Sequence, residues 1–212
     1  MNAAQYRKMF RKYSWLLLFG SMLVLLASCG SVPATYYYRV DYPAAPPAQS
    51  DPLPLTLGVG GFDCDVLYEG ERIVYRSSPY EVQYYHYRRW VAPPRKLVAD
   101  AVQQQFSASG AFRRVVSSTA GEPVDYLLRG KINAFEEWDE EEAWFGSVAI
   151  EFVLYDADNG AVIWQNRYAE KTPAAQKDPL MVVEAISASL QRVVARARED
   201  VAGFLRQANI KQ

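Results

Sequence analysis

Hydrophobic residues recur along the chain with two different periods, and each period predicts its own kind of element. Alternation of apolar residues with polar or small ones indicates a strand that has one buried face. Runs of this kind, bounded by turn-forming residues, predict strands over residues 36–40, 55–62, 73–76, 80–87, 112–116, 126–135, 148–154 and 162–168. The segment Asp158-Asn159-Gly160 separates the last two runs, and such a composition is typical of a hairpin turn.

Two other segments repeat their apolar residues at spacings of three and four, which marks one face of a helix. The first lies between Pro93-Pro94 and Gly110, and its apolar face consists of Leu97, Val98, Ala101, Val102 and Phe106. In the second, Asp178 can cap a helix that starts at Pro179 and runs to about Gln207. The pattern therefore predicts one α+β domain, in which two principal amphipathic helices pack on a mixed or mainly antiparallel sheet.

The N-terminal residues predict that the chain is exported from the cytoplasm. Basic residues come first, and the apolar run Trp15–Leu26 that follows is too short to cross a bilayer as a helix, so the layout is that of a secretory signal. The next residues, Leu26-Ala27-Ser28-Cys29, resemble the bacterial lipobox, in which the cysteine thiol accepts a lipid. We therefore predict a signal peptide over residues 1–28, a tether over 29–35 that carries a covalent lipid on Cys29, and a folded domain over 36–212.

Net charge, the residue after Cys29 and the number of cysteines indicate which ligands and which membrane the chain can have. The formal net charge is -1, and removal of the four basic residues of the signal peptide leaves -5, whereas a nucleic-acid binder is expected to be basic. Gly30 stands where an aspartate would resemble an inner-membrane retention signal, so we expect a lipid anchor in the outer membrane, facing the periplasm. Cys64 would be the one thiol left beside the lipidated cysteine, and we interpret it as a small, partly buried side chain without a disulfide.

No familiar catalytic or metal-binding motif is visible. His86 is the only histidine and has no neighbouring nucleophile, and one histidine with one thiol cannot form a usual zinc set. The acidic run Glu136–Glu142 lacks the glycine spacing of a calcium loop, so we interpret it as a solvated hairpin loop. The glycine-rich stretch Gly58–Gly61 lacks the lysine of a phosphate loop. We therefore expect no enzyme, no metal and no cofactor other than the covalent lipid.

The most distinctive stretch is Arg72–Trp90, which reads RIVYRSSPYEVQYYHYRRW. Together with the lipobox-like segment, Asp125–Gly130 (DYLLRG) and the terminal amphipathic helix, it resembles the ABC-type transport auxiliary lipoprotein family. The resemblance implies a non-enzymatic lipoprotein partner of an ABC permease and ATPase system that also contains an MCE-domain protein. Such systems move lipids between the two membranes.

The aromatic residues of this stretch are candidates for contact with a binding partner. Their alternation would place apolar side chains on both faces of a strand, and a second apolar face needs a cover. We predict that Tyr84, Tyr85, Tyr87 and Trp90 contact an MCE-type partner or another copy of the chain in a homo-oligomer, while a purely internal role stays equally open. The alternative function is a lipid-binding periplasmic shuttle that holds an acyl chain in its own cavity.

Overall fold

Eight strands and two long helices form the second of two units into which the chain divides, Met1–Ala34 and Thr35–Gln212. The computed structural model describes residues 33–43 and 51–209, so the predicted signal peptide and Cys29 lie outside the described residues. In chain order the elements are β1 (Tyr36–Tyr38), β2 (Leu53–Cys64), the 3-10 helix η1 (Val66–Tyr68), β3 (Arg72–Arg76), β4 (Gln83–Trp90), α2 (Pro94–Ala108), β5 (Phe112–Ser117), the 3-10 helix η2 (Ser118–Ala120), β6 (Tyr126–Asp139), β7 (Trp144–Asp156), β8 (Val162–Pro173) and α3 (Pro179–Asn209).

Strand β6 organises the sheet because its two edges have different partners. One edge pairs antiparallel with β7 from end to end, and β7 pairs in turn with β8. The other edge pairs parallel with β2 over residues 126–132 and then with β3 over residues 136–138. Strand β5 extends the sheet beyond β2, whereas β4 and β1 extend it beyond β3. The β6–β7 register shifts between Ile132 and Ala134, where β6 passes from one parallel neighbour to the next.

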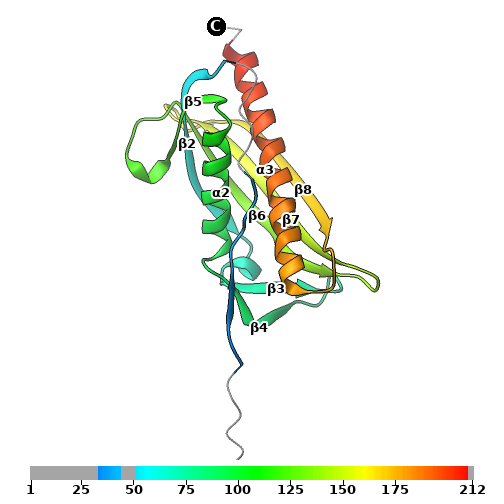
Figure 1. Ribbon diagram of the computed structural model, residues 1–212. Coiled ribbons are helices and arrows are strands. Elements are labelled where there is room, and N and C mark those ends of the chain that lie inside the picture. The colour runs from blue at the N-terminus through cyan, green and yellow to red at the C-terminus, as the bar shows by residue number, and fades with distance from the viewer. Residues whose placement is uncertain (1–32, 44–50, 210–212) are drawn as a thin grey trace, which may run out of the picture. The chain divides into compact units, whose positions relative to one another are not determined.

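Both helices cover one face of the sheet, which we call the helix face, and we call the opposite one the outer face (Figure 1). Helix α2 packs on β2 and β5, and α3 packs on β7 and β8. The core between helices and sheet includes the buried side chains of Leu57, Val98, Phe106, Leu128, Ile132, Phe135, Ile150, Phe152, Leu154, Ile186 and Leu190. Burial of each large apolar side chain contributes roughly 1.5–3 kcal/mol, so this layer holds the fold together.

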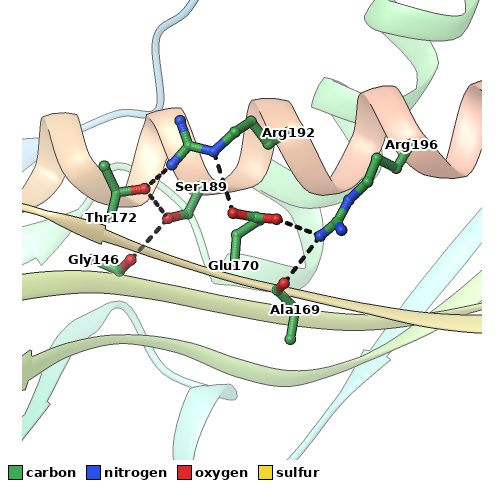
Figure 2. A network of polar contacts seen from close by, with 7 residues as sticks. All are labelled: Gly146, Ala169, Glu170, Thr172, Ser189, Arg192 and Arg196. Carbon is green, nitrogen blue, oxygen red and sulfur yellow. Dashed lines mark hydrogen bonds and ion pairs between the residues drawn. The ribbon is translucent and has the colours of Figure 1, made fainter.

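A row of polar contacts fastens α3 to the strands beneath it (Figure 2). The Ser189 hydroxyl donates to the carbonyl of Gly146 at 2.8 Å, inside the buried layer. Nearer the surface, Glu170 of β8 accepts hydrogen bonds from both Arg192 and Arg196. Arg196 also donates to the main-chain carbonyl of Ala169 at 3.0 Å. This last contact occupies a backbone acceptor on an edge strand, which is one way to protect such an edge from pairing with another chain.

The predicted elements are confirmed, and the sheet is mixed. Several strand ends differ from the predicted ones: β8 continues to Pro173, and β4 begins at Gln83, so Tyr80 lies in the preceding turn and is 96% exposed. The Asp178 cap is also confirmed, because its carboxylate accepts the Leu180 amide at 2.8 Å.

The interpretation of Glu136–Glu142 as a solvated loop is wrong for its first residues. Glu136 and Glu137 lie inside β6, and each is only 1% exposed. The turn is confined to the end of the run, where the Glu140 amide donates to the Ala143 carbonyl at 2.9 Å. The strand continues through the acidic residues because β3 and β7 pair with it on either side.

Gly146 sets the approach of α3 to the sheet. A Cβ atom on this residue would lie 2.2 Å from the Ile186 nitrogen and 2.4 Å from the Ala185 carbonyl carbon. Both are main-chain atoms, so a rotamer change cannot relieve the overlap. The absence of a side chain at residue 146 therefore lets the helix backbone lie directly on β7.

We predict that Gly146→Ala lowers the free energy of unfolding by on the order of 3 kcal/mol, because α3 must move away from the sheet. Thermal and urea unfolding measure the loss. The matched control is Gly61→Ala, since a Cβ at Gly61 has no atom within 4 Å. Equal stability of the two variants would contradict the proposed role of Gly146.

Candidate interaction surface

The β3–β4 pair brings the aromatic stretch to one end of the sheet, beside the last residues of β6. Pairing of Val74 with both Tyr84 and Glu136 places these three side chains on one face. Tyr75 pairs with Gln83 and Glu137 on the other face, and Glu137 is opposite Gly146, which contacts α3. The second group is therefore on the helix face, and the first group is on the outer face.

On the helix face, Tyr85 holds a buried carboxyl group. Its hydroxyl lies 3.0 and 3.1 Å from the two carboxylate oxygens of Glu137, and its ring packs against Tyr75 at 4.7 Å between centroids. Burial, followed by the neighbouring Asp139 carboxylate, raises the pKa of Glu137 to about 8. Burial also raises the pKa of Asp139. A carboxyl group of this kind keeps its proton at neutral pH, which is how a buried glutamate avoids the cost of an unpaired charge.

On the outer face, Glu136 has partners from two other elements. It accepts a hydrogen bond from the Tyr68 hydroxyl of η1 at 2.6 Å and another from Nε of Arg76 at 2.9 Å. Burial, helped by the bond to Glu136, raises the pKa of Tyr68. The ion pair between Arg76 and Glu136 is shielded from water, with 19% and 1% of the side chains exposed. These contacts explain why an acidic side chain can be buried here.

Cations and aromatic rings alternate across the outer face at this end of the sheet. The Arg72 guanidinium lies over the Tyr84 ring at 4.4 Å, and that of Arg76 lies over the Trp138 ring at 5.1 Å. Lys171 contacts the same Trp138 ring at 5.4 Å and the Phe145 ring at 4.2 Å. We call these six residues the outer-face row: Arg72, Tyr84, Arg76, Trp138, Phe145 and Lys171. Five of the six are aromatic residues or arginines, the types that are enriched in protein interfaces.

The four residues predicted as an interface lie in different environments. Tyr84 belongs to the outer-face row, Tyr85 is half-buried against Glu137, and Tyr87 is 43% exposed. The prediction must be corrected for Trp90, which is fully buried and packs against Phe135 at 5.1 Å between ring centroids. The reason is an irregular register, since two residue steps in β3 are opposite five steps in β4, and the simple alternation breaks between Tyr84 and Arg89.

Other residues singled out from the sequence do not join a common site. His86 is exposed, and its nearest aromatic partner is Tyr87, with 6.3 Å between ring centroids. Cys64 is partly exposed and unpaired, and burial raises the pKa of its thiol. Among residues 33–43 and 51–209, no three His, Cys, Asp or Glu side chains are grouped as a metal site would require. In the same part of the chain, no helix is both long and apolar enough to cross a bilayer.

A concavity of about 490 Å³ lies farther along the outer face. The residues around it include Gly61, Gly130 and the side chains of Asp63, Arg129, Lys131, Glu151 and Tyr155. Charges of both signs line this surface, whereas sites for hydrocarbon ligands are mainly apolar. The concavity therefore suits polar groups rather than an acyl chain.

Comparisons with known proteins agree with one another on the fold. A family model described as the ABC-type transport auxiliary lipoprotein component matches residues 38–197. The chain is similar to a crystal structure of a Xanthomonas campestris protein of the DUF330 family, with a TM-score of 0.74, 20% identity, and coverage of 82% of this chain and 99% of that one. It is also similar to an uncharacterized protein of known structure, with a TM-score of 0.64, 14% identity and coverage of 80% and 99%. No curated protein matches.

We predict that the buried carboxyl of Glu137 makes stability fall as the pH rises. The folded chain keeps this proton up to a pKa of about 8, whereas the ordinary value is 4.5, so the stabilisation is complete below pH 4.5 and is lost through pH 8. Within that window the free energy of unfolding should fall by about 1.4 kcal/mol per pH unit from this group alone. Urea unfolding at several pH values measures it.

The control for this prediction is Glu137→Gln, whose amide imitates the protonated carboxyl and can still accept the Tyr85 hydroxyl. Its unfolding free energy should depend on pH less steeply than that of the wild type between pH 4.5 and 8. Parallel curves for the two proteins would show that Glu137 is not the titrating group.

Proposed function

We propose, from the premise that this chain belongs to the family of ABC-type transport auxiliary lipoprotein components, that it is a non-catalytic accessory of an ABC and MCE-type system that moves lipids between membranes. A lipid on Cys29 anchors it in the outer membrane, and the domain faces the periplasm. Its partners are an MCE-domain protein and the ABC permease and ATPase. The protein contributes by binding and positioning these partners.

The observation that carries this proposal is the extent of the family match. Residues 38–197 run from the end of β1 to well inside α3, so the match spans almost the whole unit Thr35–Gln212. The lipobox-like segment Leu26–Cys29 precedes this unit by only a few residues, which suits a domain that a lipid holds close to a membrane. Both features support an envelope lipoprotein whose single folded domain is the functional part.

The outer-face row supports the choice of a contact surface. It presents Tyr84 and Trp138, both half-buried, with arginine side chains stacked on them, so the rings are held in place before a partner arrives. Such preorganisation lowers the entropy that association costs. On the opposite side, α3 covers β6, β7 and β8, and Tyr85 of β4 is engaged in an internal hydrogen bond to Glu137. We therefore carry Tyr84 forward from the predicted interface as the central contact with the MCE-type partner.

The alternative of a lipid-carrying shuttle has less support. The 490 Å³ concavity is lined by charged side chains. A smaller one of about 230 Å³ lies beside α2 and includes Arg39, Asp41 and Asp100 in its lining. An acyl chain would have to displace water from charged groups in either place, which costs free energy without a compensating hydrogen bond.

The test is the affinity of the purified lipoprotein for the detergent-solubilised ABC and MCE assembly. Truncation of a central interface aromatic costs about 2 kcal/mol, so Tyr84→Ala should weaken binding roughly thirtyfold. Tyr84→Ala should keep a melting temperature close to the wild-type value because its ring is partly exposed.

The matched control is Tyr155→Ala, which removes a half-buried tyrosine from the outer face at the far end of β7. It should bind like the wild type. If the Tyr84→Ala protein binds with wild-type affinity, Tyr84 is not part of the interface. If the wild-type protein itself shows no measurable binding, the accessory role is contradicted.

A further inference from the structure

A second surface lies where β1 joins β4, and it is aromatic, exposed and basic. Tyr36, Tyr37 and Tyr87 are 57%, 62% and 43% exposed, although tyrosine rings are usually at least partly covered. Strand β1 pairs parallel with β4 so that Tyr36 is opposite Arg88 and Tyr37 is opposite Arg89. We call these five residues the β1–β4 edge: Tyr36, Tyr37, Tyr87, Arg88 and Arg89.

Arg88 holds this edge in a defined arrangement. Its guanidinium donates to the Tyr38 hydroxyl at 2.9 Å and lies 5.8 Å from the centre of the Tyr36 ring and 5.7 Å from that of Tyr85. The segment after β1 is fastened to the helices as well, because the Asp41 amide donates to the Ser187 hydroxyl at 3.3 Å. The exposed tyrosines are therefore presented by ordered backbone.

The β1–β4 edge and its flanking segments are locally basic, although the chain as a whole is acidic. Residues 36–43 and 71–96, which contain β1, β3, β4 and the start of α2, carry seven basic and three acidic side chains, a net charge of +4. The chain after the predicted signal peptide carries -5. Strands β1, β3 and β4 lie together at one end of the sheet (Figure 1), and the acidic residues that end β6 lie on the side of β3 away from β4, so the basic excess is local to the β1–β4 edge. A local excess of this sign attracts anionic surfaces.

The length of chain before β1 limits where this edge can be. Six peptide steps separate Cys29 from Thr35, the first residue of the folded unit. Because an extended chain advances at most ~3.6 Å per residue, a lipid on Cys29 keeps Thr35 within roughly 22 Å of the membrane surface. Tyr36 and Tyr37 follow at once, so this edge is the part of the domain nearest in sequence to the bilayer.

We infer that the β1–β4 edge docks on the headgroup layer of the membrane that holds the anchor, with Arg88 and Arg89 contacting lipid phosphates and the tyrosine rings lying among the headgroups. This inference rests on the anchor in the proposed function. Tyrosine and arginine both favour the boundary between water and hydrocarbon, because each combines an apolar body with a polar end. Docking fixes the orientation of the domain and leaves the outer-face row to a protein partner.

The experiment uses the lipidated protein in vesicles of phosphatidylglycerol and phosphatidylcholine, in vesicles of phosphatidylcholine alone, and in detergent micelles. N-acetylimidazole acetylates accessible tyrosine hydroxyls, and mass spectrometry identifies them. Labelling of Tyr36, Tyr37 and Tyr87 should fall several-fold in anionic vesicles relative to micelles and should recover at high salt, which screens the arginines. Labelling of Tyr155, at the far end of the sheet, should be the same in every sample.

Arg89→Ala should lower the ratio of docked to undocked protein about fivefold, the effect of one arginine near an anionic surface. Arg113→Ala, which removes an exposed arginine of β5, should leave the ratio unchanged. Equal labelling of the edge tyrosines in micelles and anionic vesicles would overturn the inference, and so would equally strong protection in phosphatidylcholine alone. Protection that appears only when the ABC and MCE assembly is added would also overturn it, because the surface would then belong to a protein partner.

The same spectra report the acyl mass on Cys29, which separates the two proposals. A chain without the lipid would contradict the proposed function. A lipidated chain whose edge tyrosines stay fully labelled would overturn only the docking surface.

Discussion

The division of one edge of β6 between two parallel strands is the constraint on which the rest of the structure depends. Strand β2 occupies the first half of that edge and β3 the second, while β7 pairs along the whole opposite edge. A strand enclosed in this way has no free backbone edge, and side chains from other elements cover Glu136 and Glu137 on its two faces. Glu136 and Glu137 then need polar partners, and the fold supplies Tyr68 and Arg76 on one face and Tyr85 on the other.

The same division separates the sheet into a part that is covered by α2 and a part that is not. Strands β2 and β5 carry α2 and belong to the packed core, whereas β3, β4 and β1 form an end that α2 does not cover. Seven tyrosines lie in these last three strands. Hydrogen bonds to the buried carboxyl groups hold these strands in register, so exposed rings are presented in fixed positions, as a protein that acts by binding requires.

Much of the fold could be predicted from the sequence because its periods are clear. Helix α2 follows from apolar spacing between Pro93-Pro94 and Gly110, α3 follows from the Asp178 cap, Pro179 and apolar spacing, and the hairpin between β7 and β8 follows from Asp158-Asn159-Gly160. The family resemblance could also be recognised, since the stretch Arg72–Trp90 is distinctive and the family model covers it.

The contact surfaces could not be predicted in the same way, for two physical reasons. The burial of Glu136 depends on Tyr68 and Arg76, which lie 68 and 60 residues earlier in the chain, and a run of acids in isolation resembles a solvated loop. The place of Trp90 depends on the irregular β3–β4 register, which interrupts the alternation that a strand pattern assumes. The outer-face row likewise contains residues from β3, β4, β6, β7 and β8, so no local sequence motif predicts it.

The central claim is that this chain works in the envelope by holding a protein partner on the outer face of its sheet. Photocross-linking in intact cells tests it most directly, with p-benzoylphenylalanine at position 84 of the outer-face row. The account predicts a cross-link from position 84 to a component of the ABC and MCE assembly. The same probe at position 155, on the far end of that face, should give no such product. A cross-link from position 84 only to lipid, or to no protein at all, would contradict the account.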